Sequence, residues 1–217
     1  MNKFCFARTR RSWRLLSFML AVFIFAETQP AVPDTAQSLS GRLLVASPSM
    51  KDPGFAKTVI LMVRHNADGA FGLIVNRATA VAPAAKLLQF IIGAEKDSED
   101  SEDSAGGRQV RVHYGGPVQP RRWFFLHSND YTDARTNIIT EQVSLTSHPD
   151  ILRALAKDKG PAMGFLALGY AGWGPGQLES EMARKDWITV APDGALILDD
   201  DMATKWRRAL DKRGVDL

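Results

Sequence analysis

The sequence predicts an α+β domain with a mixed or antiparallel sheet that curls into a barrel-like core with flanking helices. Short runs rich in β-branched and aromatic residues recur along the chain at strand length. Between them lie segments whose apolar residues repeat with helical spacing. Because the order is strands, helix, strands, helix, strands, helix, without strict alternation, a doubly wound parallel sheet is disfavoured.

The first 40 residues differ in character from the rest of the chain. Met1–Arg14 carries five basic side chains and no acid, and Leu15–Ala26 is apolar apart from Ser17. A helix of that apolar length spans about 18 Å, short of the ~30 Å hydrocarbon core. We therefore interpret residues 1–40 as a signal-like or anchor segment with a linker, and residues 41–217 as a single domain. An extension created by an upstream start remains an alternative.

The charge distribution argues against a broad nucleic-acid-binding surface. The net charge of +3 is contributed entirely by residues 1–36, whereas the remainder carries 22 basic and 22 acidic side chains. A neutral domain has no extended positive field to attract phosphate backbones. The only cysteine is Cys5, so the domain contains no disulfide, thiolate nucleophile or cysteine-type zinc site.

The first half of the domain is predicted to begin with strands and a hairpin. Two prolines and a glycine make 47–54 an irregular loop, and Asp68-Gly69 is typical of a turn between two strands. A helix follows, and the acidic run 95–107 is too polar to be buried. The expected strands are 42–46, 57–64, 70–76, 109–113 and 123–127, the last two around the turn 115–117, and the expected helix is 83–92.

The second half is predicted to alternate between helices and short strands. Ser147 can cap a helix that contains Pro149 in its first turn, and Gly214 is a stop signal. The last helix has Met202, Trp206, Ala209 and Leu210 on one face. The expected helices are 149–157, one from about 177 to 185, and 201–212; the expected strands are 163–168, 187–190 and 195–198.

Three blocks together resemble the YqgE/AlgH family: LLVASPSMKDPGFAKTVILMVRHNADGAFGLIVNR at 43–77, VHYGGPVQPRRWFFLH at 112–127 and LGYAGWGPGQLESEMARKDWITV at 168–190. The resemblance implies an α+β fold with a barrel-like sheet, but no catalytic mechanism. Members are often labelled transcriptional regulators. Their chains usually begin close to the first strand, and the proteins lie in the cytosol, whereas residues 1–26 here suggest export or membrane attachment. Asp186 replaces the asparagine that is common in the family.

The segment from Gly169 to Gln177 is the most unusual stretch. It lacks the Gly-Lys-Ser/Thr ending of a phosphate loop and the glycine spacing of a dinucleotide fingerprint. One interpretation is a pocket in which Tyr170 or Trp173 stacks on a ligand or partner. The alternative is that the glycines permit a tight strand-to-helix turn and close packing.

The remaining candidates have ordinary explanations as well. His113 and His127 end predicted strands, but no histidine pair shows local metal-ligand spacing. Glu179 is two residues from Glu181, a poor spacing for a catalytic pair on a helix. The predicted ligand or partner-binding residues are Asp52, Asn76, Gly115, Gly116, Pro117, Tyr170, Trp173, Gly174, Gly176, Gln177 and Glu179.

We therefore predict a non-enzymatic regulatory or interaction domain that binds a protein or small ligand through the loops 47–54, 115–120 and 169–177. No metal, cofactor or catalytic residue is expected, and membrane contact is expected through 15–26 only. One alternative is an enzyme of unknown class that uses His113, His127, Asp52 or Glu179. The other is a DNA-binding regulator that uses the basic cluster of the last helix: Lys205, Arg207, Arg208, Lys212 and Arg213.

Overall fold

The computed structural model describes residues 38–93 and 107–213, which lie within one compact unit running from Gln37 to Leu217. The predicted leader at 1–26, most of the linker, most of the acidic run at 95–107 and the stop signal at Gly214 lie outside the described residues.

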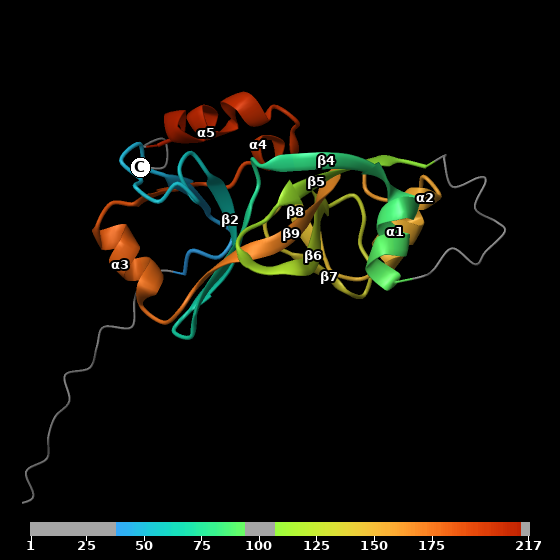
Figure 1. The fold of residues 1–217 in the computed structure, drawn as a ribbon, viewed down its shortest axis with the longest axis horizontal. Helices are drawn as coiled ribbons and strands as arrows, with labels where there is room; N and C mark the ends of the chain where they lie inside the picture. The colour runs from blue at the N-terminus through green and yellow to red at the C-terminus, as the bar shows by residue number, and fades with distance from the viewer. Residues whose placement is uncertain (1–37, 94–106, 214–217) are drawn as a thin grey trace, which may run out of the picture. The chain divides into compact units, whose positions relative to one another are not determined.

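The described residues form an α+β fold built on one curled ten-stranded sheet, as the sequence predicts (Figure 1). The main strand order is β10-β1-β2-β3-β9-β6-β8-β7, and its neighbours pair antiparallel. The exception to antiparallel pairing is β5, which pairs parallel with β9 and antiparallel with β4. The strands are β1 (Leu43–Ala46), β2 (Val59–Asn66), β3 (Gly69–Ile74), β4 (Ala78–Pro83), β5 (Gln109–Tyr114), β6 (Val118–Ser128), β7 (Thr136–Ile138), β8 (Val143–Thr146), β9 (Gly164–Trp173) and β10 (Trp187–Val190).

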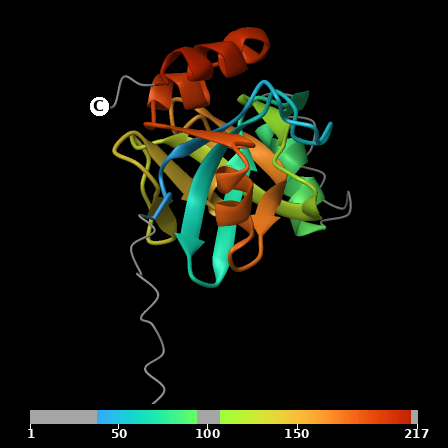
Figure 2. The ribbon, with the colours of Figure 1, turned by 90° about the vertical axis from the view of Figure 1, so that its left-hand side faces the viewer.

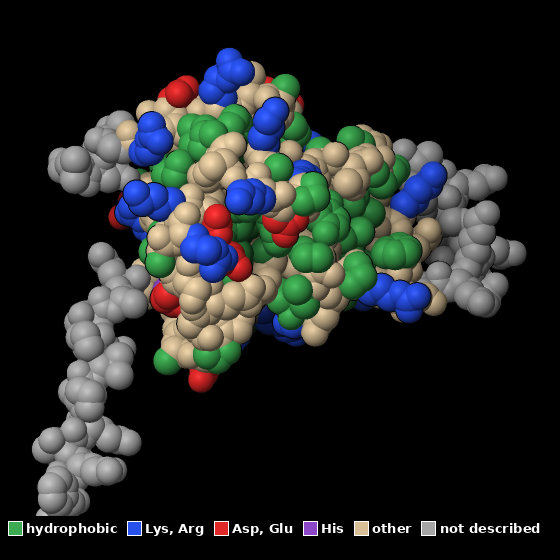
Figure 3. Space-filling view, turned by 60° about the vertical axis from the view of Figure 1, so that its left-hand side comes forward, with side chains coloured by type: hydrophobic (Ala, Val, Ile, Leu, Met, Phe, Trp, Pro, Cys, Tyr) green, Lys and Arg blue, Asp and Glu red, His purple; other side chains and the backbone are tan. Residues whose placement is uncertain are grey.

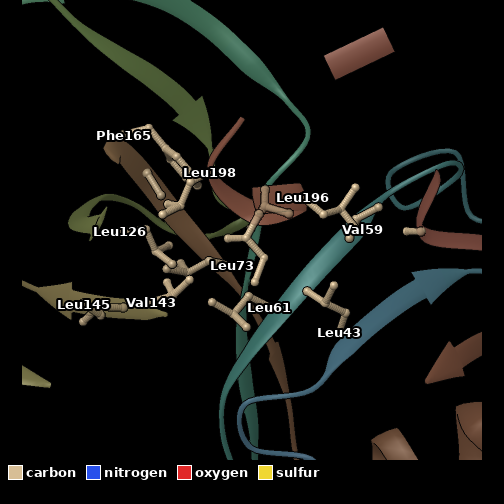
Figure 4. Close-up of a cluster of buried hydrophobic side chains, with 14 of the residues drawn as sticks. Leu43, Val59, Leu61, Leu73, Leu126, Val143, Leu145, Phe165, Leu196 and Leu198 are labelled. Carbon is tan, nitrogen blue, oxygen red and sulfur yellow. The ribbon is translucent and has the colours of Figure 1, made fainter. Parts of the chain in front are cut away.

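Five helices in the described residues cover the two faces of this sheet. Inside the curl, α4 and α5 close one end of an apolar core, part of which is drawn in Figure 4. Every second residue of a strand enters this core, as Leu43 and Val45 do in β1, because successive side chains point to opposite faces of the sheet. The helices are α1 (Ala84–Ile92), α2 (Asp150–Ala156), α3 (Gln177–Ala183), α4 (Gly194–Leu198) and α5 (Met202–Asp211).

Two further apolar clusters cover the outer face of the curl. Helices α1 and α2 pack over β5, β6 and β9 through residues such as Leu87, Leu152 and Phe125. Helix α3 packs over the β1–β3 half through Leu178, which joins Trp173 and its neighbours, and Figure 2 looks directly onto this helix. The outer face near α3 is where two of the three predicted binding loops, 47–54 and 169–177, meet.

Several predicted elements differ from the observed ones. Residues 195–198 form helix α4 instead of a strand, because Asp193 accepts the Leu196 N–H at 2.9 Å and caps a helical turn. Strand β9 continues through Trp173, five residues beyond the predicted strand end at 168, and the predicted strand-to-helix turn follows at 174–176. The N-cap of α2 is Pro149, without a side-chain cap from Ser147. Strands β4, β7 and β8 were not predicted.

Candidate functional site

Two of the predicted binding loops meet in a pocket of about 680 Å³ on the α3 side of the domain. The loop after β1 forms one wall, and the end of β9 with α3 forms the other. We call this cavity the tryptophan pocket. Its lining residues are Ser49, Met50, Lys51, Asp52, Phe55, Gly172, Trp173, Gln177, Glu181, Arg184, Asp186 and Trp187.

Two tryptophans form the apolar floor of the tryptophan pocket. Trp173 ends β9 and Trp187 begins β10, so the strands on either side of α3 deliver both rings to the same place. Their ring centroids lie 5.9 Å apart with the planes at 80°, and Phe55 meets Trp187 edge-on at 5.7 Å. Such edge-to-face contacts are favourable and fix the orientation of the rings.

Glu181 joins the two tryptophans through a single carboxylate oxygen. Its Oε2 accepts the indole Nε1–H of Trp173 and that of Trp187, each at 2.8 Å. Its Oε1 accepts the Gln177 Nε2–H at 2.9 Å, and Gln177 Oε1 in turn accepts the Gly174 N–H at 3.1 Å. This network satisfies both indole donors, which would be costly to leave unpaired in a half-buried site.

The loop that forms the opposite wall is also fixed by hydrogen bonds. Asp52 Oδ1 accepts the Gly54 N–H at 2.7 Å, and the Asp52 carbonyl accepts the N–H groups of Phe55 and Ala56. Arg77 Nη1 donates to the Gly54 carbonyl at 2.8 Å, which ties the loop to the end of β3. Asp52 therefore shapes the loop in addition to lining the pocket.

The glycines predicted near 115 serve close backbone packing outside the pocket. A Cβ added at Gly115 would lie 2.4 Å from the Gly169 carbonyl oxygen, and one at Gly116 would lie 2.1 Å from the Tyr170 carbonyl carbon. Pro117 is exposed beside them. Glycine is therefore required at both positions, because the turn after β5 packs directly against the backbone of β9.

Tyr170, Asn76 and Glu179 also lie away from the tryptophan pocket. Tyr170 faces the inner core, with its ring 5.1 Å from Phe71, because it is on the opposite face of β9 from Trp173. Asn76 accepts the Val59 N–H at 2.9 Å and donates to the Lys57 carbonyl. Thus Asp52, Trp173 and Gln177 come together in the pocket, Gly174 and Gly176 support its wall, and the other predicted residues do not meet there.

The two histidines of the enzymatic alternative are fully buried and do not line the tryptophan pocket. His113 stacks on Phe165 at 3.9 Å, and burial, with the charges of Arg111 and Lys205, lowers its pKa to about 3. His127 donates through Nδ1 to the Ser128 carbonyl and accepts the Thr146 hydroxyl at Nε2, and burial lowers its pKa. No group of three or more metal-ligating side chains gathers within 38–93 and 107–213.

The basic cluster of α5 is largely engaged within the domain. Lys205 is completely buried, Arg208 Nη1 lies 2.6 Å from Asp199 Oδ2, and Lys212 Nζ lies 2.6 Å from Asp193 Oδ2. These three cations contribute little to an outward-facing positive surface. None of the helices in the described part of the chain has the length and apolarity needed to cross a membrane.

Glu181 and Trp187 were not among the predicted site residues, although the sequence contains a signal for each. Gln177 and Glu181 are four residues apart and so share one face of a helix. Trp187 follows that helix after three residues of turn and begins a strand, which returns it to the same wall. What the sequence does not contain is the pairing of β10 with β1 that places it there.

The family model described as AlgH-like matches residues 43–217. A UPF0301 protein of Cereibacter sphaeroides is 41% identical over 179 residues, covering 82% of this chain and 93% of that protein. Another from Methylocella silvestris is 44% identical, covering 82% and 86%. The solution structure of the AlgH protein from Pseudomonas aeruginosa matches with a TM-score of 0.66 and 32% identity over 83% of this chain and 92% of that one. A Corynebacterium diphtheriae structure, at 20% identity and a TM-score of 0.61 over 81% and 87%, shows a similar fold.

Proposed function

We propose that this chain, which belongs to the AlgH-like family, is a non-enzymatic binding domain that holds a segment of a partner protein in the tryptophan pocket. The observation that carries this proposal is the fixed pair of tryptophans beneath an open cavity, both held by Glu181. Protein ligands are commonly anchored by apolar side chains that enter such pre-formed, aromatic-lined pockets.

The hydrogen-bonding state of the pocket carboxylates supports binding over catalysis. Glu181 already accepts three hydrogen bonds, and Asp52 uses its side chain to cap its own loop. A general base needs a free lone pair directed at the proton that it removes. Glu181 is therefore better suited to holding the shape of the pocket than to moving protons, and Asp52 already uses one carboxylate oxygen to shape its loop.

The lining of the pocket indicates a peptide-like occupant. Met50 and Phe55 are half-buried and present apolar surface beside the tryptophans. Charged side chains of both signs surround this surface: Lys51, Asp52, Arg184 and Asp186, of which the last two form an ion pair at 3.0 Å. Figure 3 shows acidic and basic side chains intermingled on this side of the domain. An apolar anchor flanked by polar backbone and mixed charges matches this pattern.

The experiment is a selection of random peptides displayed on phage against the full-length chain, with counter-selection against the variant Met50→Glu. This variant places a charge on the apolar wall of the pocket. The matched control is Phe90→Glu, which makes the same kind of change at a side chain of α1 that is 72% exposed and remote from the lining. Circular dichroism confirms that each variant is folded.

We expect the selected peptides to carry a large apolar residue, to bind the wild type and Phe90→Glu alike, and to lose at least about tenfold in affinity on Met50→Glu. Peptides that bind all three proteins equally would place recognition elsewhere on the surface. A complete failure to select peptides, together with saturable binding of a small molecule at the tryptophans, would replace the peptide with that ligand class.

A further inference from the structure

A second cavity, of about 270 Å³, lies away from the tryptophan pocket, where β5 meets the end of α4. We call it the arginine pocket, after the two arginines that line it, Arg108 and Arg111. The wall also includes Phe125 and Met163, and the carboxylates of Asp199 and Asp200. The cavity is therefore a small, mixed site whose lining includes two arginines and two aspartates.

The two guanidinium groups have donors to spare. Arg111 donates to the carbonyls of Leu198 at 2.5 Å and Asp199 at 2.7 Å, and Arg108 donates through Nη1 to the Pro161 carbonyl. Each guanidinium carries five N–H donors. In the part of the chain that the structure describes, neither arginine forms an ion pair with a carboxylate within 4.0 Å.

The positive charge around Arg111 is only partly compensated. Lys205 is completely buried nearby, and its Nζ lies 3.2 Å from Asp199 Oδ1. The same carboxylate pairs with Arg208 through Oδ2 at 2.6 Å, so Asp199 is shared between two cations. Asp200 is exposed at the edge. Arg208 also lies 3.8 Å from Asp201 Oδ2, so it has a second acidic partner. The shared Asp199 and the exposed Asp200 are therefore the carboxylates near Arg108, Arg111 and Lys205.

His113 is buried within the electrostatic field of Arg111 and Lys205. Its ring is completely buried, and neither nitrogen forms a hydrogen bond of normal geometry, although the Val75 carbonyl lies near enough to favour the protonated form. Burial lowers the pKa of His113 most, and the charges of Arg111 and Lys205 lower it further. Arg111 and Lys205 therefore produce a positive electrostatic potential at His113.

We propose that the arginine pocket binds a small anion, a carboxylate or phosphate group, that takes the remaining donors of Arg108 and Arg111. The planar fork of a guanidinium matches the oxygens of both groups, and partial burial strengthens the interaction by excluding water. The volume lies just below the usual range for ligand cavities, which restricts the occupant to a small acid or a phosphate group with little attached.

The test is calorimetric titration of the full-length chain with two probes, inorganic phosphate and succinate. We expect saturable binding of at least one probe, and the stronger of the two identifies the class of anion. Arg108→Gln should weaken that binding by at least about tenfold. The control Arg121→Gln removes the same charge from an exposed position on β6 and should leave affinity within about twofold. Arg111 is left unchanged because its bonds to Leu198 and Asp199 also hold α4.

A second readout distinguishes the site from binding elsewhere. An anion in the arginine pocket offsets the field of Arg111 and Lys205, so it should raise the pKa of His113, followed by NMR of its ring protons. Absence of saturable binding by both probes overturns the proposal, as does equal weakening by Arg108→Gln and Arg121→Gln, or binding that leaves the His113 resonances unmoved.

Discussion

His65 Nε2 lies 2.7 Å from Glu179 Oε1, which joins strand β2 to the first turn of helix α3. The other ring nitrogen, Nδ1, accepts the Leu39 N–H at 3.0 Å, so the hydrogen of the neutral ring is carried by Nε2 and donated to Glu179. The backbone of His65 also bonds with Ser38 and Ser40. A single histidine thus fastens the chain before β1 to β2, and β2 to α3.

Replacing His65 with alanine should free the segment around Leu39. The Leu39 N–H loses its acceptor, and we expect its amide to exchange with solvent at least about tenfold faster. The control is Glu179→Gln, whose carbonyl oxygen still accepts the Nε2 hydrogen and should leave the exchange rate close to that of the wild type. Hydrogen exchange followed by mass spectrometry measures both. Unchanged protection in His65→Ala would mean that the serines alone hold the segment.

Replacing Glu181 with alanine should destabilise the domain by about 2–4 kcal/mol, because the indole N–H groups of Trp173 and Trp187 both lose their acceptor. Urea unfolding followed by tryptophan fluorescence gives the free energy of unfolding. Glu141→Ala, at an exposed position, is the control and should cost less than about 0.5 kcal/mol. Equal effects of the two substitutions would show that water satisfies the indoles.

Two glycines that both have positive φ should respond differently to alanine. At Gly176, with φ 71°, no atom lies within 4 Å of an added Cβ, so only backbone strain of about 1 kcal/mol is expected. At Gly116, with φ 150°, the Cβ would meet the Tyr170 backbone at 2.1 Å. We expect Gly116→Ala either to prevent folding or to lower the free energy of unfolding, measured in urea, by more than about 3 kcal/mol. A smaller loss of stability than for Gly176→Ala would contradict the packing of this turn on β9.

Replacing His113 with leucine should reduce the sensitivity of the fold to acid. The folded-state pKa of His113, about 3, is below its ordinary value of 6.5, so between these values the unfolded chain binds the proton and the folded chain does not. Stability therefore falls as the pH drops through this window, by on the order of 2 kcal/mol between pH 7.5 and 5 from this group. The difference in the free energy of unfolding between the wild type and His113→Leu, measured in urea, should change by that amount between these two pH values. A constant difference across the window would contradict the depressed pKa.

Lys205 should make a contribution of the same sign at alkaline pH. Burial lowers its pKa from 10.5 to about 8, although Asp199 partly opposes the shift. Between these values the unfolded chain holds a proton that the folded chain has lost, so stability rises with pH. Relative to Lys205→Met, the wild type should gain on the order of 2 kcal/mol between pH 7.5 and 9.5. If the stability difference between the two proteins stays flat, the buried amine titrates at its ordinary value.

The sequence predicts the fold class well where local signals and burial agree. Asp68-Gly69 lies at the β2–β3 turn, and the apolar spacing over 83–92 matches α1. The strand predicted at 195–198 is wrong because four apolar residues in a row are compatible with a buried helix as well, and only the cap from Asp193 distinguishes the two. The short strands β7 and β8 were missed because their pairing with each other and with β6, more than their composition, defines them.

Among the predicted binding residues, Asp52, Trp173 and Gln177 lie in the two walls of the tryptophan pocket, whereas Glu181, which joins the tryptophans, is not among the predicted residues. The glycines of 169–177 have two roles: Gly169, in β9, lets the backbone near Gly116 approach, and Gly174 and Gly176 lie in the turn between β9 and α3. Glu179, a predicted site residue, instead contacts His65. Whether a carboxylate near a helix terminus turns toward one neighbour or another depends on tertiary packing, which no local pattern encodes.

The position of strand β9 late in the chain affects how the domain can fold during synthesis. It hydrogen-bonds with β3, β5 and β6, which are all synthesised before it. Until residue 173 has left the exit tunnel, each of these strands has an edge without its final neighbour, and such edges readily pair with other chains. Closure of the sheet is therefore a late, non-local event, which slows folding and leaves unpaired strand edges exposed until it is complete.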